Sequence, residues 1–179
     1  MEVLDRLVRI DPENTDAHYL LGQNLLRAGK TQEAVEQWKI AVKLDPQNVS
    51  SLYNLARTLA KAKDLEAKIY LERFEALQKT EQLSDRVQRL NNFALESANA
   101  HNWPLAVEQL QESIKTCGQC KQLPVLHRNL GLIYARKGDI EAGRHELETA
   151  LQINPHDSDA QKVLQVLRRI PPPNTSSSK

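Results

Sequence analysis

A stretch of sequence that decides the fold occurs twice in this chain. Residues 17–46 read AHYLLGQNLLRAGKTQEAVEQWKIAVKLDP, and residues 126–155 read LHRNLGLIYARKGDIEAGRHELETALQINP. Both copies have a Leu-Gly pair at the same place, a second glycine seven residues later and a closing proline. Each copy therefore predicts two helices with a turn at the second glycine. The second helix is expected to end at the closing proline, because proline cannot continue a helix and disfavours helical geometry in the residue before it. The chain is therefore expected to contain an internal repeat.

The repeated pattern resembles the tetratricopeptide repeat, a helix–turn–helix unit of about 34 residues with a Trp-x2-Leu-Gly-x2-Tyr…Ala-x3-Phe…Pro signature. The first copy fills it with Leu21, Gly22, Leu25, Gly29, Ala34, Trp38, Ala41 and Pro46, and the second with Leu130, Gly131, Tyr134, Gly138, Leu147, Ala150 and Pro155. The resemblance implies an all-α fold, the right-handed α-α superhelix of a tetratricopeptide solenoid with about four repeats. Stacked helix pairs of this kind enclose a concave surface.

Two weaker repeats are expected between the copies, because Gly22 and Gly131 are 109 residues apart. That interval is about three 34-residue periods plus seven residues. In the two inner repeats Leu71 and Leu110 are expected to fill the place of Trp38 between neighbouring helix pairs. The predicted repeats are at about 15–48, 49–83, 87–120 and 124–157, after a half-repeat at 1–12 and before a capping helix at 158–170 whose N-cap is Ser158 or Asp157. Residues 1–170 are thus expected to form one repeat domain, and residues 171–179 a disordered tail or linker.

Composition excludes several classes of protein. The 179 residues carry a formal net charge of +1, and 40% of them are hydrophobic. A near-neutral chain lacks the positive field that drives nucleic-acid binding, and no run approaches the ~18 apolar residues of a membrane span. No Ser/His/Asp set, paired-carboxylate site or phosphate loop is recognisable. The chain is therefore expected to be no enzyme and to need no cofactor.

In this family the first helix of each repeat lines the concave surface, so the resemblance implies a binding groove there. The predicted groove residues are Tyr19, Gln23, Tyr53, Asn54, Arg57, Lys61, Asn91, Asn92, Leu95, Arg128, Asn129, Leu132, Arg136 and Lys162. The set contains no Asp or Glu, because most acidic residues fall on the second helices. Asn54, Asn92 and Asn129 can donate to and accept from the main chain of an extended peptide. The three arginines can each bind a carboxylate through two parallel hydrogen bonds.

The groove favours a non-catalytic protein–protein interaction module that binds a peptide or partner segment, with a preference for acidic ligands. The alternative is a structural, assembly or spacer domain of a larger, secreted or catalytic polypeptide, with self-association through exposed terminal helices. The subfamily that clamps C-terminal carboxylates needs Lys-x3-Asn in one repeat and Lys-x3-Arg two repeats later. Here the corresponding pairs are Tyr19 with Gln23 and Gln88 with Asn92, so that specific activity is not assigned.

Cys117 and Cys120 form a single Cys-x2-Cys motif between the third and fourth repeats. We interpret them first as structural thiols, with a local disulfide and a metal or redox site as the alternatives. A structural zinc site needs four ligands, and a thioredoxin-type site needs a βαβ context; the sequence provides neither. The compartment stays open. It is cytoplasmic by default, and periplasmic or secreted if a signal sequence lies upstream.

Overall fold

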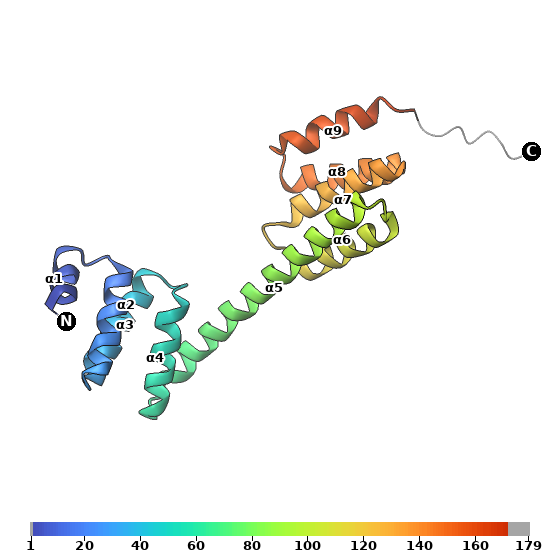
Figure 1. Ribbon diagram of the computed structural model, residues 1–179. Coiled ribbons are helices and arrows are strands. Elements are labelled where there is room, and N and C mark those ends of the chain that lie inside the picture. The colour runs from blue at the N-terminus through green and yellow to red at the C-terminus, as the bar shows by residue number, and fades with distance from the viewer. Residues whose placement is uncertain (1, 172–179) are drawn as a thin grey trace, which may run out of the picture. The chain divides into compact units, whose positions relative to one another are not determined.

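The structure, a computed structural model, describes residues 2–171, and within that range it contains nine α-helices and no β-strand (Figure 1). The helices are α1 (Glu2–Ile10), α2 (Thr15–Arg27), α3 (Thr31–Leu44), α4 (Val49–Lys61), α5 (Ala67–Asn99), α6 (Trp103–Cys117), α7 (Leu123–Lys137), α8 (Ile140–Ile153) and α9 (Ser158–Arg168). None of these helices combines the length and the hydropathy that a bilayer span requires. Residues 172–179 of the predicted tail lie outside the described residues.

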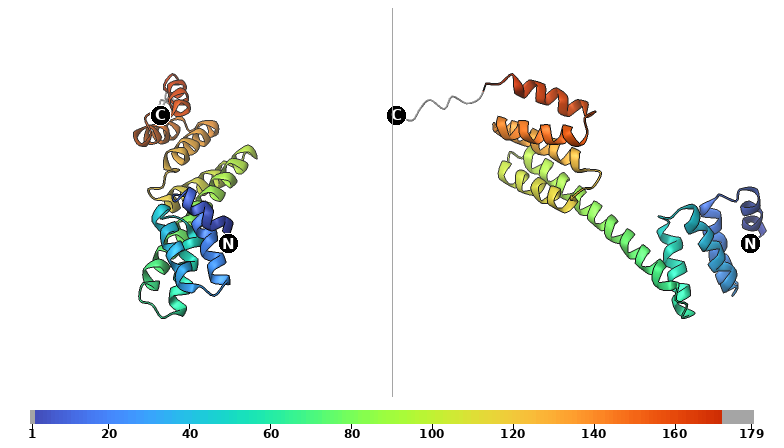
Figure 2. Two further views of the ribbon diagram at one scale, coloured as in Figure 1. Left: turned by 90° about the vertical axis from the view of Figure 1, so that its left-hand side faces the viewer. Right: turned by 180° about the vertical axis from the view of Figure 1, so that it is seen from behind.

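The chain forms two compact units, of which unit 1 ends at Glu81 and unit 2 begins at Gln82. In unit 1, α2 packs against α3, and α3 packs against α4. In unit 2, α6, α7, α8 and α9 pack in chain order, each against the next, as Figure 2 shows for the antiparallel α7 and α8. The predicted all-α fold class of the tetratricopeptide α-α superhelix is confirmed in these stacked helical hairpins. One domain over residues 1–170 stays a prediction.

The second helix of the second predicted repeat and the first helix of the third form one continuous helix. Helix α5 runs without interruption from Ala67 to Asn99. Elsewhere the second helices end at Asp45-Pro46 and Asn154-Pro155, where proline stops the helix. Between residues 67 and 99 there is neither proline nor glycine, so no residue forces the helix to end.

The core of unit 1 is centred on Trp38, whose side chain is fully buried. Its indole Nε1 donates a hydrogen bond to the carbonyl oxygen of Tyr19 at 3.2 Å. A Cβ atom on Gly22 would lie only 2.5 Å from the same Nε1, so only glycine allows α2 to approach α3 this closely. The Leu-Gly pair and the tryptophan of the repeat signature are therefore one packing unit.

The core of unit 2 repeats this arrangement with different residues. A Cβ atom on Gly131 would lie 2.8 Å from Cγ of Leu147 and 3.0 Å from the carbonyl oxygen of Gly143. Leu110 and Leu147 are fully buried, as predicted. The close approach of α7 and α8 thus depends on glycine in both helices.

Leu71 does not fill the corresponding place in the second repeat, and its prediction was wrong. The side chain is 45% exposed. The residues of α5 that pack on the unit 1 core are Ala67, Tyr70, Phe74 and Leu77. These positions recur every three or four residues and form one helical stripe. Leu71 is one position beyond Tyr70 and therefore lies beside that stripe rather than in it.

Equivalent residues of the two strong repeats also make equivalent polar contacts. His18 Nδ1 lies 2.7 Å from Gln37 Oε1, and His127 Nδ1 lies 2.6 Å from Glu146 Oε2. Both contacts join a first helix to a residue 19 positions later on the second helix. The two units therefore share their internal geometry as well as their sequence pattern.

Candidate functional site

The predicted groove residues are divided between the two units. In unit 1 they lie on α2 and α4, and in unit 2 on the C-terminal part of α5 and on α7 and α9. Most of them are exposed or half-buried, including Asn54, Asn92, Leu95 and Leu132, whereas Asn129 is buried.

Aromatic residues lie close together among the predicted groove residues of unit 1. The ring centroids of Tyr53 and Phe74 are 5.3 Å apart. The guanidinium carbon of Arg57 lies 5.9 Å from the Tyr53 centroid, within the range of a cation–π contact. On the neighbouring helix, Gln23 Nε2 donates to the hydroxyl oxygen of Tyr19 at 2.6 Å. Tyr53 is still 45% exposed, so this apolar surface is open to a ligand.

Arg57 and Lys61 line a surface pocket of about 300 Å³ in unit 1. The other lining residues are Leu26, Thr31, Thr58 and Ala62. No ion pair is formed by either cation within residues 2–171. The pocket therefore combines two uncompensated positive charges with an apolar side chain.

Carboxamides line a second pocket, in unit 2. Asn129 Nδ2 donates to Asn91 Oδ1 at 2.8 Å, which joins α7 to α5. Asn91 and Asn92 contribute to a pocket of about 190 Å³, together with Gln88, Gln122, Val125 and Leu126. The pairing uses one donor of Asn129 and one acceptor of Asn91, so the Asn91 amino group is left to donate to a ligand.

Arg128 is not available to a ligand in the way the sequence suggested. Its Nη1 donates to Asp157 Oδ2 at 2.9 Å, and the Asp157 side chain is only 5% exposed. Asp157 is also the N-cap of α9 and accepts hydrogen bonds from the backbone N–H groups of Asp159 and Ala160. Arg128 therefore stabilises the start of the capping helix instead of presenting a free positive charge.

The contacts of Asp157 change the pKa of its carboxyl group. Burial raises its pKa, but the hydrogen bond from the Ala160 N–H, the hydrogen bond and charge of Arg128 and the Asp159 N–H outweigh it. The net effect lowers the pKa of Asp157 below its ordinary value. The carboxyl group is therefore held in its charged form.

The two remaining cations of the predicted set, Lys162 and Arg136, differ in their contacts. Lys162 lies 3.9 Å from Asp159, one turn earlier on α9. Arg136 has no ion-pair partner among the described residues, and it lines a pocket of about 410 Å³ with Ala98, Asn99, His101 and Trp103. The rings of His101 and Trp103 meet edge to face with centroids 5.4 Å apart.

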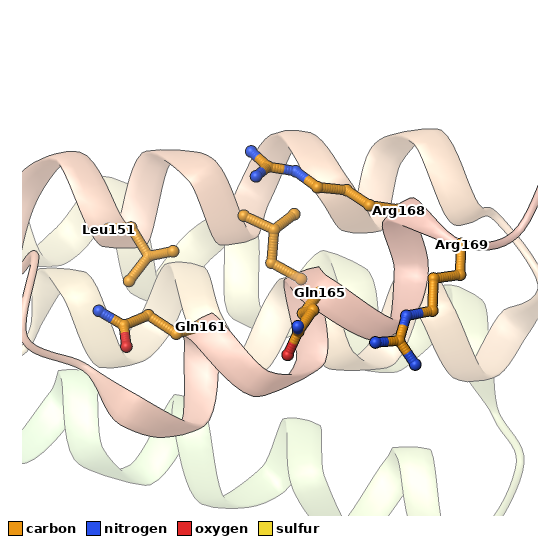
Figure 3. Close-up of a pocket in the computed structure, with 6 residues that line it drawn as sticks. Leu151, Gln161, Gln165, Arg168 and Arg169 are labelled. Carbon is orange, nitrogen blue, oxygen red and sulfur yellow. The ribbon is translucent and has the colours of Figure 1, made fainter.

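A further hollow of about 380 Å³ lies between α8 and α9 and contains none of the predicted groove residues. Figure 3 shows Leu151 on α8 beside Gln161, Gln165 and Arg168 of α9 and beside Arg169, which directly follows α9. Arg168 Nη2 is 2.9 Å from Glu148 Oε1, so part of its charge is compensated within the unit.

Cys117 and Cys120 are joined by a disulfide at the end of α6. This corrects our first interpretation of them as structural thiols and agrees with the alternative of a local disulfide. Across residues 2–171 the structure holds no group of three or more His, Cys, Asp or Glu side chains arranged to bind a metal ion.

Two models of the tetratricopeptide repeat match this chain. One matches residues 2–38 and 19–76, and the other matches residues 124–157. Together the matches cover more than half of the chain. The chain belongs to the tetratricopeptide repeat family. Proteins built from this repeat are generally non-catalytic modules that bind other proteins or peptides, so the family supports a protein-interaction scaffold.

Several solved structures are similar to this tetratricopeptide repeat chain. A structure of the APC/C hetero-tetramer Cut9–Hcn1 has 16% sequence identity, a TM-score of 0.47 and coverage of 93% of this chain. This chain spans only 38% of that protein's length. YrrB, described as a tetratricopeptide repeat protein with an unusual peptide-binding site, has 17% identity and a TM-score of 0.41, with 90% and 97% coverage. A thermophilic tetratricopeptide repeat protein of Thermus thermophilus has 20% identity and a TM-score of 0.43, with 94% and 89% coverage. No curated protein sequence matches significantly.

Proposed function

We propose that this chain is a non-catalytic scaffold that holds a segment of a partner protein on its first helices and favours acidic segments. The observation that carries the proposal is that several cations of the predicted groove have no acidic partner. Arg57, Lys61 and Arg136 have no acidic partner within the described part of the chain and line pockets on the first helices. An uncompensated cation beside an apolar surface attracts a carboxylate that arrives with its own apolar side chain.

The carboxamides support an extended ligand in unit 2. Asn91 and Asn92 border the pocket of about 190 Å³, and carboxamides can bind both the N–H and the C=O of a peptide main chain. Main-chain hydrogen bonds of this kind are independent of the partner's side chains. We therefore expect the carboxamides to hold the backbone of the ligand and the unpaired cations to select acidic sequences.

Replacing Tyr53 or Asn92 by alanine is expected to weaken peptide binding. The probes are labelled peptides from a random-sequence array, graded in Asp and Glu content, and the readout is fluorescence anisotropy. Each variant should weaken the best acidic peptide by about tenfold, the effect of a single central interface residue. Both side chains are exposed, so the fold should survive.

Glu108→Ala on the second helix α6 is the matched control, because Glu108 is exposed and outside the groove. It should leave the affinity unchanged. The proposal fails if no peptide of any composition binds, or if Tyr53→Ala and Asn92→Ala bind the selected peptides as tightly as the unmodified chain.

A second candidate role is self-assembly through α1. Val3 is 79% exposed and Ile10 72% exposed on this helix, while Leu4 and Val8 pack on the unit 1 core. An exposed apolar face of this kind can pack on a second copy. Light scattering at high concentration should then show a mass above the monomer that falls with Val3→Glu. A strict monomer at every concentration would contradict this role.

A further inference from the structure

Two of the pockets described above occupy the same place in the repeat, one in each unit. Counting starts at the small residue that ends the Leu-Gly step of each first helix: Gly22, Ala56, Ala94 and Gly131 in order. Leu26 and Ala98 are four residues after Gly22 and Ala94, and Thr31 and Trp103 are nine residues after them. Lys61 and Arg136 are each five residues after the small residue of the following first helix. These six residues line the two pockets.

The pockets therefore share a construction. The lining of each contains an apolar residue of one first helix, the first residue of the second helix that follows it, and a cation of the next first helix. No Asp or Glu is among the lining residues of either pocket. The apolar surface fits the methylene groups of a side chain, and the cation fits a terminal negative charge.

The other cations of the predicted groove set differ from those in the two pockets, because they have acidic partners. Arg128 is paired with Asp157 at 2.9 Å, and Lys162 lies 3.9 Å from Asp159. The groove cations without an acidic partner in residues 2–171 are Arg57, Lys61 and Arg136, and all of them line one of the two pockets. Within the predicted groove set, every cation without an acidic partner in residues 2–171 thus lines one of these two pockets.

We propose that these pockets are a duplicated acceptor site for acidic side chains: each takes one Glu or Asp of a partner protein. The carboxylate binds Lys61 in unit 1 and Arg136 in unit 2, while the ligand methylenes contact Leu26 in unit 1 or the half-buried indole of Trp103 in unit 2. This inference rests on the proposed function and makes it more specific, because the partner must present two acidic residues. The near-neutral net charge of the chain argues against an extended polyanion as the natural ligand.

The two sites are not identical, and the difference predicts which of them binds a carboxylate more tightly. The unit 1 pocket contains a second cation, Arg57, held by Tyr53. The unit 2 pocket has the imidazole of His101 and the indole of Trp103 beside Arg136. The unit 1 site should therefore bind a carboxylate more tightly, and the unit 2 site should prefer an acidic residue next to a larger apolar one.

The test uses the full chain and three synthetic probes. The first is a labelled peptide with one Leu-Glu pair, the second has two Leu-Glu pairs joined by a long Gly-Ser linker, and the third replaces each Glu of the second with Gln. Two linked sites convert the second binding event into an intramolecular one, so the two-pair peptide should bind at least about tenfold more tightly than the one-pair peptide. The Gln peptide should bind more weakly than both.

Charge reversals then assign the sites. Lys61→Glu and Arg136→Glu should each weaken the two-pair peptide by about tenfold and reduce it to the affinity of the one-pair peptide. The double variant should lose the distinction between the Glu and Gln peptides. Lys43→Glu and Lys115→Glu are the matched controls, because they change the net charge equally from exposed positions on second helices outside both pockets. The controls should change the affinity by less than about twofold, as expected for screened surface charges.

The outcomes separate this inference from the proposed function. The acceptor sites are overturned if the Glu and Gln peptides bind equally, or if the control reversals weaken binding as much as Lys61→Glu and Arg136→Glu. They are also overturned if only Tyr53→Ala and Asn92→Ala weaken binding, a result that leaves the proposed function standing. If none of these substitutions matters, both proposals fail. Circular dichroism of each variant excludes unfolding as the cause.

Discussion

Replacement of Trp38 by alanine is expected to lower the free energy of unfolding of unit 1 by about 3–5 kcal/mol, the usual range for deleting a buried tryptophan side chain. The indole is fully buried and belongs to the cluster that includes Leu21, Leu25 and Leu52. It contacts α2 at Gly22, where there is no side chain to move into the cavity. The neighbouring helices can therefore collapse only partly, and most of the lost contact energy is not recovered.

The two tryptophans make this prediction easy to measure. The chain contains only Trp38 and Trp103, so the fluorescence of the Trp38→Ala variant comes from Trp103 in unit 2 alone. Urea unfolding followed by circular dichroism should show an early loss of helix in the variant, whereas the fluorescence transition should keep its midpoint. This separation is expected because the buried contacts of Trp38 lie within unit 1.

Trp38→Phe is the control, since it keeps an aromatic ring in the site. It loses the hydrogen bond to Tyr19 but only part of the side-chain volume. Its loss of stability should be clearly smaller than that of the alanine variant. The packing account is contradicted if alanine and phenylalanine cost the same, or if the alanine variant unfolds at the midpoint of the unmodified chain.

The fold could be predicted from sequence because the residues that determine it act locally. Gly22 and Trp38 belong to one hairpin, and Pro46 and Pro155 end helices through their own rings. Helix α5 could not be predicted in the same way. Its residues favour a helix throughout, so whether a repeat boundary interrupts it depends on packing with distant residues rather than on any local residue.

The site could be predicted only as a set of helix faces. Repeat spacing identifies residues that lie on the first helices, and the charge asymmetry between first and second helices is visible in the sequence. The partners of those residues are not visible. Asp157 is 29 residues from Arg128, and Asn91 is 38 residues from Asn129. The sequence contains one indication of the Arg128–Asp157 pair. Asp157 was a candidate N-cap, and a capping carboxylate at the end of a repeat can attract a cation of the preceding first helix.

Replacement of Asp157 by alanine is expected to lower the free energy of unfolding of unit 2 by about 2–4 kcal/mol, from the lost N-cap and the charge left without a partner. The two causes can be separated with Asp157→Asn. Asparagine can still accept from the N–H groups of Asp159 and Ala160 and so keeps the cap. It lacks the negative charge that pairs with Arg128. The asparagine variant should therefore lose about half as much stability as the alanine variant, measured by urea unfolding followed by circular dichroism.

The same pair predicts a pH dependence whose sign follows from the pKa. The pKa of Asp157 is lower in the folded chain than its ordinary value of 3.8, so the unfolded chain binds this proton first as the pH falls. The stabilisation from Asp157 is complete above about pH 5 and is lost as the pH falls through the ordinary value to the folded one. The difference in stability between the unmodified chain and Asp157→Asn should accordingly shrink from pH 7 toward pH 3. Asp159→Asn, in the exposed first turn of the same helix, should show little of this effect. A difference that stays constant or grows on acidification would show that the Asp157 charge does not hold α9 in place.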